Sequence, residues 1–296
     1  MKNSHPIYIP SKGRYEKMLT ADTLKAMGCD YYVVVEPKEY DLYRTNEKHK
    51  NNLLVLDLSY KDTYELLDEH GLTKSTGPGP ARNFAWQHSI DQGHKWHWVM
   101  DDNIDGFARL NNNKRHPVQS AGILKAMEDF CDRYENVAMA GPEYRFFAPE
   151  RSISQPFKLN TRIYSCNLIR NDINLRWRGR YNEDTILSLD MLEQGYCTVS
   201  FYAFLQNKLR TSTLGGGNTE EFYDKEGTLP KSKMLVDVYP QYSTLVHKFQ
   251  RWHHHVDYSG FKNLPILKAG HEKINRVNEY GMKFIERQSK TYRSNI

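Results

Sequence analysis

Residues 96–103 read Trp-His-Trp-Val-Met-Asp-Asp-Asn, an apolar run that stops abruptly at two carboxylates and an amide. The run from Trp96 to Met100 has the length and composition of a buried β-strand. Carboxylates at the edge of a sheet are costly to bury unless a cation compensates them, and Mg²⁺ or Mn²⁺ prefers such oxygens. The stretch therefore predicts a strand that ends in a cation site, with an ordinary acidic turn as the alternative.

Earlier apolar runs indicate further strands of the same kind. The strand-like runs are Pro6–Pro10, Tyr31–Val35 and Leu53–Leu58, and amphipathic helix patterns lie at Tyr15–Met27 and Ala81–Ile90. Strands that alternate with helices favour a mainly parallel sheet, whose ligands bind beyond the carboxyl ends of the strands. Polar residues follow these ends, since Ser11-Lys12-Gly13-Arg14 comes after the first run and Glu36-Pro37 after the second.

The second half of the chain predicts a more mixed arrangement. Helices are expected at Gln119–Tyr134, Asn182–Gln194, Tyr239–Trp252 and Leu267–Arg287, and strands at Asn136–Ala140, Phe157–Ile169 and Cys197–Leu205. The glycine-rich segment Thr211–Glu221 is expected to be a loop, and a lid over a ligand is one use for it. We therefore expect an α/β protein with a mixed, mainly parallel sheet flanked by helices, followed by a C-terminal helical extension.

Composition places the chain among ordinary globular proteins. Its 296 residues are 39% hydrophobic and 26% charged, which excludes disordered, collagen-like and low-complexity classes. No apolar stretch approaches the ~18 residues of a membrane-spanning helix. The opening residues lack a signal-peptide pattern, so we expect an intracellular protein with no membrane partner. The four cysteines lie at least 31 positions apart, which fits neither a zinc knuckle nor a compact disulfide framework.

Positive charge gathers at the C-terminal end. The formal net charge is +5, and residues 245–296 hold ten Lys and Arg against four Asp and Glu. A basic end on a near-neutral body suits a polyanionic partner such as nucleic acid, whereas a solvated helix face is the simpler alternative.

Two further segments combine a helix start with charged residues. Residues 77–82 read Gly-Pro-Gly-Pro-Ala-Arg, so free helix N–H groups and Arg82 would suit a diphosphate. Residues 178–184 read Arg-Gly-Arg-Tyr-Asn-Glu-Asp, with Asn182 as a candidate N-cap. A carboxylate in the first helical turn stays ionised and can act as a general base. For both segments, a plain helix start is the alternative.

The run His253–His255 and the nearby His247 offer imidazole ligands. Imidazole binds first-row divalent ions, so one of the four could complete a metal site, and we take His253 as the candidate. Contact with phosphates and plain surface exposure remain alternatives.

Taken in order, these segments resemble the GT-A family of nucleotide-sugar glycosyltransferases over about residues 6–205. The resemblance implies a GT-A (Rossmann-like) fold and a UDP-sugar donor. The implied donor-binding residues are Pro10, Ser11, Lys12, Arg14, Glu36, Arg82, Asp101 and Asn103. Asp102 would hold Mn²⁺ or Mg²⁺, and Asp184 or its neighbour Glu183 would deprotonate the acceptor. The third position of the family's Asp-x-Asp motif is Asn103 here, which lacks charge.

More narrowly, the segments Ile9–Arg14, Trp98–Asn103 and Arg180–Thr185 look like those of the bacteriophage TET-associated DNA glycosyltransferases. The resemblance implies inverting transfer of a glucose- or arabinose-type sugar to 5-hydroxymethylcytosine, in base-flipped or single-stranded phage DNA in the host cytoplasm. Residues 1–105 would bind the nucleotide sugar, residues 106–243 the acceptor, and residues 244–296 would form the basic extension. The implied DNA-binding residues are Arg178, Arg180, Lys248 and Arg251.

Three other functions fit parts of this pattern. One is a GT-A enzyme that acts on a polysaccharide, a lipid-linked sugar or a protein. Another is a metal-dependent nucleotidyltransferase or nuclease, because those enzymes also cluster carboxylates after a strand. The last is a DNA-binding module without catalytic activity, which the uncharged Asn103 makes reasonable.

Overall fold

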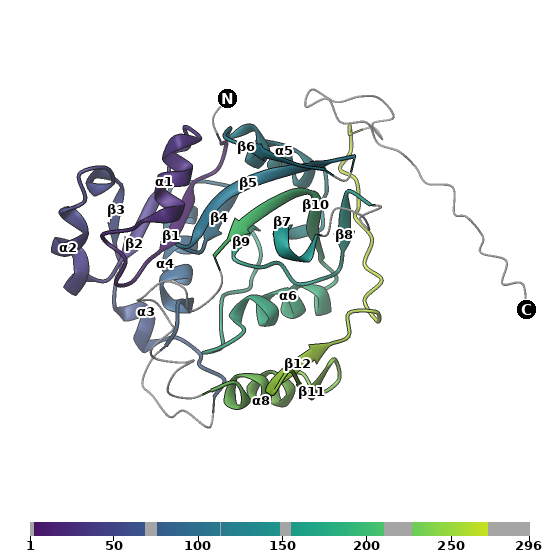
Figure 1. The fold of residues 1–296 in the computed structure, drawn as a ribbon. Coiled ribbons are helices and arrows are strands. Elements are labelled where there is room, and N and C mark those ends of the chain that lie inside the picture. The colour runs from purple at the N-terminus through teal and green to yellow at the C-terminus, as the bar shows by residue number, and fades with distance from the viewer. Residues whose placement is uncertain (1–2, 69–75, 113, 149–154, 210–226, 272–296) are drawn as a thin grey trace, which may run out of the picture.

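The fold is built on one large β-sheet (Figure 1), seen in a computed structural model that describes residues 3–68, 76–112, 114–148, 155–209 and 227–271. The sheet has ten strands in the order β3-β2-β1-β4-β9-β7-β10-β5-β6, with β8 paired to β10. The strands are β1 (Ile7–Pro10), β2 (Tyr32–Val35), β3 (Leu53–Val55), β4 (Trp96–Met100), β5 (Ile104–Asn111), β6 (Lys114–Val118), β7 (Val137–Tyr144), β8 (Phe157–Leu159), β9 (Cys166–Arg170) and β10 (Cys197–Lys208).

The strand directions confirm a mixed α/β sheet of the GT-A kind. Strands β3, β2, β1 and β4 run parallel to one another, and β7 runs parallel to β10. Strand β9 lies antiparallel between β4 and β7, so these two are parallel to each other. Strands β5 and β8 each pair antiparallel with β10, and β6 pairs antiparallel with β5. Every residue of β4 is buried, which explains its continuous apolar run.

Helices cover both faces of the sheet (Figure 1). Helices α1 (Leu19–Ala26) and α5 (Gly122–Cys131) pack on one face, where they share a core with Trp96, Trp98 and Met100. Helices α4 (Gly79–Asp91) and α6 (Glu183–Glu193) pack on the other. The shorter helices are η1 (Pro37–Glu39), α2 (Tyr40–Arg44), η2 (Lys50–Asn52), α3 (Ser59–Asp62), η3 (Arg145–Phe147) and α8 (Leu229–Val238).

The topology brings four strand ends to one edge of the sheet. Because β1, β4, β7 and β10 are parallel, their carboxyl ends lie on the same side. Strand β9 runs the other way, so it begins at this edge with Ser165 just before it. The edge therefore collects the residues that follow Pro10 and Met100, together with Tyr144 and Lys208 at the ends of β7 and β10.

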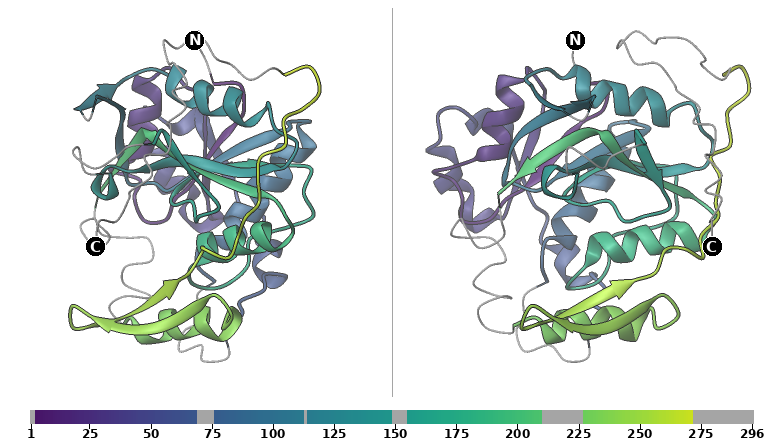
Figure 2. Two further views of the ribbon diagram at one scale, coloured as in Figure 1. Left: turned by 90° about the vertical axis from the view of Figure 1, so that its right-hand side faces the viewer. Right: turned by 45° about the vertical axis from the view of Figure 1, so that its right-hand side comes forward.

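The helix expected at Tyr239–Trp252 is wrong. The chain forms a β-hairpin there, with β11 (Ser243–Lys248) paired antiparallel to β12 (Arg251–Val256). Phe249 and Gln250 make the tight turn in left-handed backbone (φ 53° and 58°), and partly buried and exposed side chains alternate from His253 to Val256. Figure 2 shows the hairpin beside α8 and beneath α6, to which both are joined by a shared apolar cluster.

The expected helical extension is not seen in the part of the C-terminal region that the structure describes. Residues 244–271 form the hairpin and then an irregular segment, in which Leu267 makes an isolated bridge to Tyr134. The remainder of the helix expected at Leu267–Arg287, and the loop expected at Thr211–Glu221, lie outside the described residues. The division into domains stays a prediction. Among the described residues, no helix is long and apolar enough to cross a membrane.

Candidate functional site

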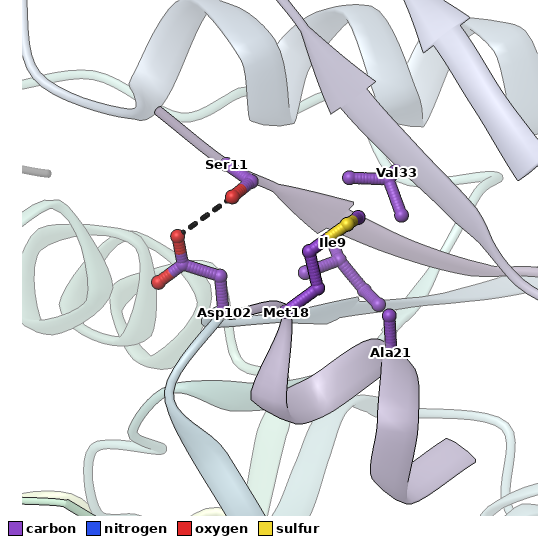
Figure 3. A pocket seen from close by; sticks show the side chains of 6 residues that line it. All are labelled: Ile9, Ser11, Met18, Ala21, Val33 and Asp102. Atoms are coloured by element: carbon purple, nitrogen blue, oxygen red, sulfur yellow. Dashed lines mark hydrogen bonds between the residues drawn. The ribbon is translucent and has the colours of Figure 1, made fainter. Parts of the chain in front are cut away.

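Ser11 and Asp102, from the ends of β1 and β4, meet at this edge. The Ser11 hydroxyl donates a hydrogen bond to Asp102 Oδ2 (2.9 Å), as Figure 3 shows, and the Arg14 guanidinium pairs with Asp102 Oδ1. Burial raises the pKa of Asp102 and the nearby charge of Asp101 adds to this rise, while Arg14 and Ser11 oppose it. The negative charge of Asp102 is therefore only partly compensated by its protein partners.

A small recess lies beside this contact. Its lining residues are Ile9, Ser11, Met18, Ala21, Val33 and Asp102 (Figure 3). The recess has no room for even a water molecule, so it cannot hold a sugar nucleotide in this conformation.

Asp101 joins two cations that come from distant parts of the chain. Its Oδ1 accepts a hydrogen bond from Arg82 Nη2 (2.8 Å), and its Oδ2 accepts one from Lys208 Nζ (2.6 Å). Burial alone would raise the pKa of Asp101, but the charges of Lys208 and Arg82 outweigh it and hold the pKa below its ordinary value. Asp101 is therefore an ionised carboxylate that positions both cations.

Arg82 lies in the first turn of α4 and is only 4% exposed. Its guanidinium lies 4.6 Å from the centre of the Trp177 ring, and its Nη1 lies 3.2 Å from Glu183 Oε1. Within the described part of the chain, the buried Nε has no hydrogen-bond partner, and Nη1 makes no hydrogen bond besides its ion pair with Glu183. A guanidinium with N–H donors to spare is suited to bind the oxygens of a phosphate.

The start of α4 depends on a glycine. A Cβ atom at Gly79 would lie 1.9 Å from the hydroxyl oxygen of Tyr64. That hydroxyl donates a hydrogen bond to the carbonyl of Gly179 (2.8 Å), which belongs to the segment leading into α6. Gly79 therefore lets the N-terminal ends of α4 and α6 approach, and this approach brings Arg82 to Glu183.

The two candidate bases occupy the first turn of α6. Asn182 has the N-cap position in left-handed backbone (φ 54°), but its amide donates to the carbonyl of Lys231 (2.8 Å). Burial raises the pKa of Glu183; Arg82 opposes the rise and Asp184 adds to it. Asp184 is half-buried and accepts a hydrogen bond from the backbone N–H of Thr185 (2.8 Å).

Two further polar residues at this edge were not predicted from the sequence. Lys208 donates to Ser165 Oγ (2.8 Å) as well as to Asp101, and the Tyr144 hydroxyl lies 2.5 Å from Ser165 Oγ. The signal that found Asp101, a polar residue after an apolar strand, applies to both of them. It was missed because the expected strands stopped at Ala140 and Leu205, short of the true ends.

The other residues expected to bind the sugar-nucleotide donor also lie near this edge of the sheet. Burial would raise the pKa of Glu36, but Lys61 (2.5 Å) and Lys38 (3.2 Å) outweigh it and lower the pKa. Pro10 and Lys12 are half-buried beside Ser11. The Asn103 side chain is buried, and its amide lies 3.4 Å from the carbonyl of Leu209.

The residues expected to bind DNA divide into two groups. Arg178 makes a bidentate pair with Asp190 (2.6 and 2.9 Å), and the buried Arg180 pairs with Asp68 (2.9 Å). These contacts favour a structural role for both. Lys248 and Arg251 are exposed and face each other across the hairpin turn, where phosphates can reach them. Their role in DNA binding stays a prediction.

Asp101 and Asp102 are the residues that would hold a divalent ion, if one arrives together with a phosphate ligand. Magnesium is usually held by one or two carboxylates and by substrate phosphates, and Asp101 and Asp102 supply such hard oxygens. The negative charge of Asp102 is only partly compensated by its protein partners, so an added cation would stabilise it. Among the described residues, no group of three or more His, Cys, Asp or Glu side chains is arranged as a metal site, and His253 is exposed on β12.

The arrangement can bind a diphosphate through Arg82 and can place a carboxylate base beside it on α6. No curated protein matches the chain. The family model of the TET-Associated Glycosyltransferase matches residues 5–217, which include every strand of the sheet and both helix starts of the site. On that match, the chain belongs to the TET-associated glycosyltransferase family.

Proposed function

We propose that this glycosyltransferase moves a sugar, of the glucose or arabinose type, from a UDP-sugar to the hydroxyl group of 5-hydroxymethylcytosine in DNA. The family supports glycosyl transfer. The observation that carries the proposal is the convergence of Arg82, Asp101 and Glu183, from three elements, at the edge where open α/β sheets bind their ligands.

Donor binding begins with the opening of the contact between Arg14 and Asp102. The recess beside Asp102 is too small for a sugar nucleotide while the pair is closed, so the uridine must separate the segment after β1 from the end of β4. Arg82 then binds the diphosphate with its spare N–H donors. Asp101 and Asp102 would hold a Mn²⁺ or Mg²⁺ ion, which supplies positive charge to the departing diphosphate when bound.

Asp184 is the proposed general base. Glu183 is engaged with Arg82 and its raised pKa disfavours the ionised form, whereas Asp184 carries no such ion pair to Arg82. The acceptor oxygen forms a bond to the anomeric carbon while the bond from that carbon to the diphosphate oxygen breaks. Asp184 takes the hydroxyl proton and UDP leaves with the electron pair. A single displacement of this kind inverts the anomeric carbon.

The test combines a panel of UDP-sugars with hydroxymethylated and unmodified DNA, followed by mass spectrometry of the nucleosides. We expect a mass increase of one sugar on hydroxymethylcytosine alone, together with release of UDP. Transfer to a polysaccharide or protein but to no DNA would refute the proposed acceptor. Release of pyrophosphate or nicking of the DNA would refute glycosyl transfer and favour a nucleotidyltransferase or a nuclease.

A further inference from the structure

Four aromatic side chains form a continuous shelf at the edge that carries Asp101. The aromatic shelf comprises Tyr144, Phe146, Phe147 and Tyr164. The Tyr144 and Tyr164 rings are stacked, with centres 5.1 Å apart and planes inclined by 17°. Phe147 lies 5.5 Å from Tyr144, and Phe146 lies 5.5 Å from Phe147.

The outer part of the shelf is exposed. The Phe146 side chain is 78% exposed and the Phe147 side chain is 50% exposed. Adjacent apolar rings left open to water lose the free energy that burial would give them, and contiguous exposed apolar surface typically marks a binding site. The exposed rings are therefore suited to bind a partner with a flat, apolar face.

The inner end of the shelf touches the proposed donor site. Ser165 links the two, because its hydroxyl contacts both the Tyr144 hydroxyl (2.5 Å) and Lys208 Nζ (2.8 Å), and Lys208 holds Asp101 (2.6 Å). Ser165 itself lies in left-handed backbone (φ 57°), a strained conformation that clusters at functional sites. Burial raises the pKa of the Tyr144 hydroxyl, Lys208 opposes the rise, and the charges of Asp101 and Asp184 add to it.

Cations border the shelf. The Arg162 guanidinium lies 4.0 Å from the centre of the Tyr164 ring, and Arg145 is exposed at the start of η3. An aromatic platform flanked by Arg side chains is the arrangement that binds single-stranded nucleic acid, because bases stack on the rings and phosphates pair with the cations. A protein or lipid partner would not need both features together.

We propose that the aromatic shelf is the acceptor subsite, on which a pyrimidine base lifted out of DNA stacks against Phe147 and Phe146. This inference rests on the proposed function and names the surface that presents the acceptor. Stacking offsets the few kcal/mol needed to take a base out of a duplex. A base on the shelf has its edge toward Tyr144 and Lys208, where the sugar donor and Asp184 are proposed to act.

The experiment compares the wild-type protein with the double variant Phe146→Ala/Phe147→Ala. The probe is a single-stranded oligonucleotide carrying 2-aminopurine, whose fluorescence is quenched on stacking, and transfer is assayed with a hydroxymethylated oligonucleotide and with the free 5-hydroxymethyl-2′-deoxycytidine nucleoside. We expect the double variant to lose the quenching and to raise KM about tenfold or more for both acceptors, since one base–aromatic stack is lost or weakened. UDP affinity should stay unchanged, and Phe147→Trp should retain both quenching and KM.

Leu264→Ala is the matched control, because Leu264 is a similarly exposed apolar residue outside the shelf. Quenching and KM that are the same in the double variant as in the wild-type protein would overturn the proposal. The proposal would also be overturned if the wild-type protein were a dimer, the double variant were a monomer, and the acceptor KM did not change. The shelf would then be a subunit interface. Quenching on the shelf without sugar transfer to any DNA would instead refute the proposed function and leave the shelf as a nucleic-acid site.

Discussion

Replacing Lys208 with methionine tests how the site is held together. The Lys208 and Asp101 side chains are 17% and 24% exposed, and their charged atoms lie 2.6 Å apart. Removing one partner of a fully buried pair costs about 3–5 kcal/mol, whereas an exposed pair is worth roughly 0–1 kcal/mol. Because Asp101 keeps Arg82 as a second partner and both side chains are mostly buried, we expect the variant to lose about 2 kcal/mol of unfolding free energy at pH 7.

The loss should depend on pH in a defined direction. In the folded protein the pKa of Asp101 lies below its ordinary value, largely through Lys208. A lowered carboxyl pKa stabilises the fold at pH values above the unfolded pKa, near 3.9, and this stabilisation disappears as the pH falls through the folded pKa. Lys208→Met reduces the lowering, so Asp101 takes up a proton at a higher pH in the folded variant than in the folded wild-type protein. The difference in stability between the two proteins should therefore shrink as the pH falls below the pKa of Asp101 in the folded variant.

Urea unfolding followed by tryptophan fluorescence measures both quantities. Lys48→Met is the control, because Lys48 pairs with Asp22 at 3.4 Å with both side chains exposed, and its loss should change stability by less than about 0.5 kcal/mol. A change for Lys208→Met no larger than that of the control, or a difference that stays constant throughout the acid range, would refute the stabilising role of the Lys208–Asp101 pair. Retained sugar transfer by Lys208→Arg is also expected, since it keeps the charge.

Three other outcomes follow from the geometry. Asp184→Asn should lower transfer by about 10²–10⁴-fold, the usual contribution of a general base, while UDP binding measured by calorimetry survives; full activity would contradict its role. Asp102→Ala should weaken UDP-sugar binding, and chelation of divalent ions should reduce transfer by the wild-type protein more than by this variant; equal affinity in the two proteins would remove Asp102 from the donor site. Gly79→Ala should lower the thermal midpoint by the equivalent of about 1–3 kcal/mol, because its Cβ meets the Tyr64 hydroxyl. Gly106→Ala is the control, because a Cβ there meets no atom within 4 Å and its backbone is not left-handed; an unchanged midpoint for Gly79→Ala would show that α4 shifts freely.

Local patterns predicted much of the sheet and the first half of the site. The strands at Ile7–Pro10, Tyr32–Val35 and Trp96–Met100 lie where the apolar runs indicated, because strands buried on both faces leave a continuous apolar signal. Ser11 and Asp102 follow two of these strands, and the rule that parallel strands end at one edge explains why their side chains form a hydrogen bond.

The same reasoning failed where the signal is not local. The stretch from Ser243 to Val256 was expected to be helical, yet its β-branched and histidine residues pair as a hairpin that packs with α8 against α6. Helix and strand patterns are hard to tell apart over a short segment, so packing against α8 and α6 decided between the two structures.

The amino-acid sequence by itself determined the order of strands and helices in the first half and the acids and bases available at their ends. Only the tertiary structure decided which distant residues make contact. Lys208 pairs with Asp101, 107 residues away in the chain. Arg178 pairs with Asp190 and Arg180 with Asp68, and four aromatic rings lie together in one shelf. The physical reason is that periodicity and turn preferences act over a few residues, whereas ion pairing and ring stacking depend on distances that sheet topology alone establishes.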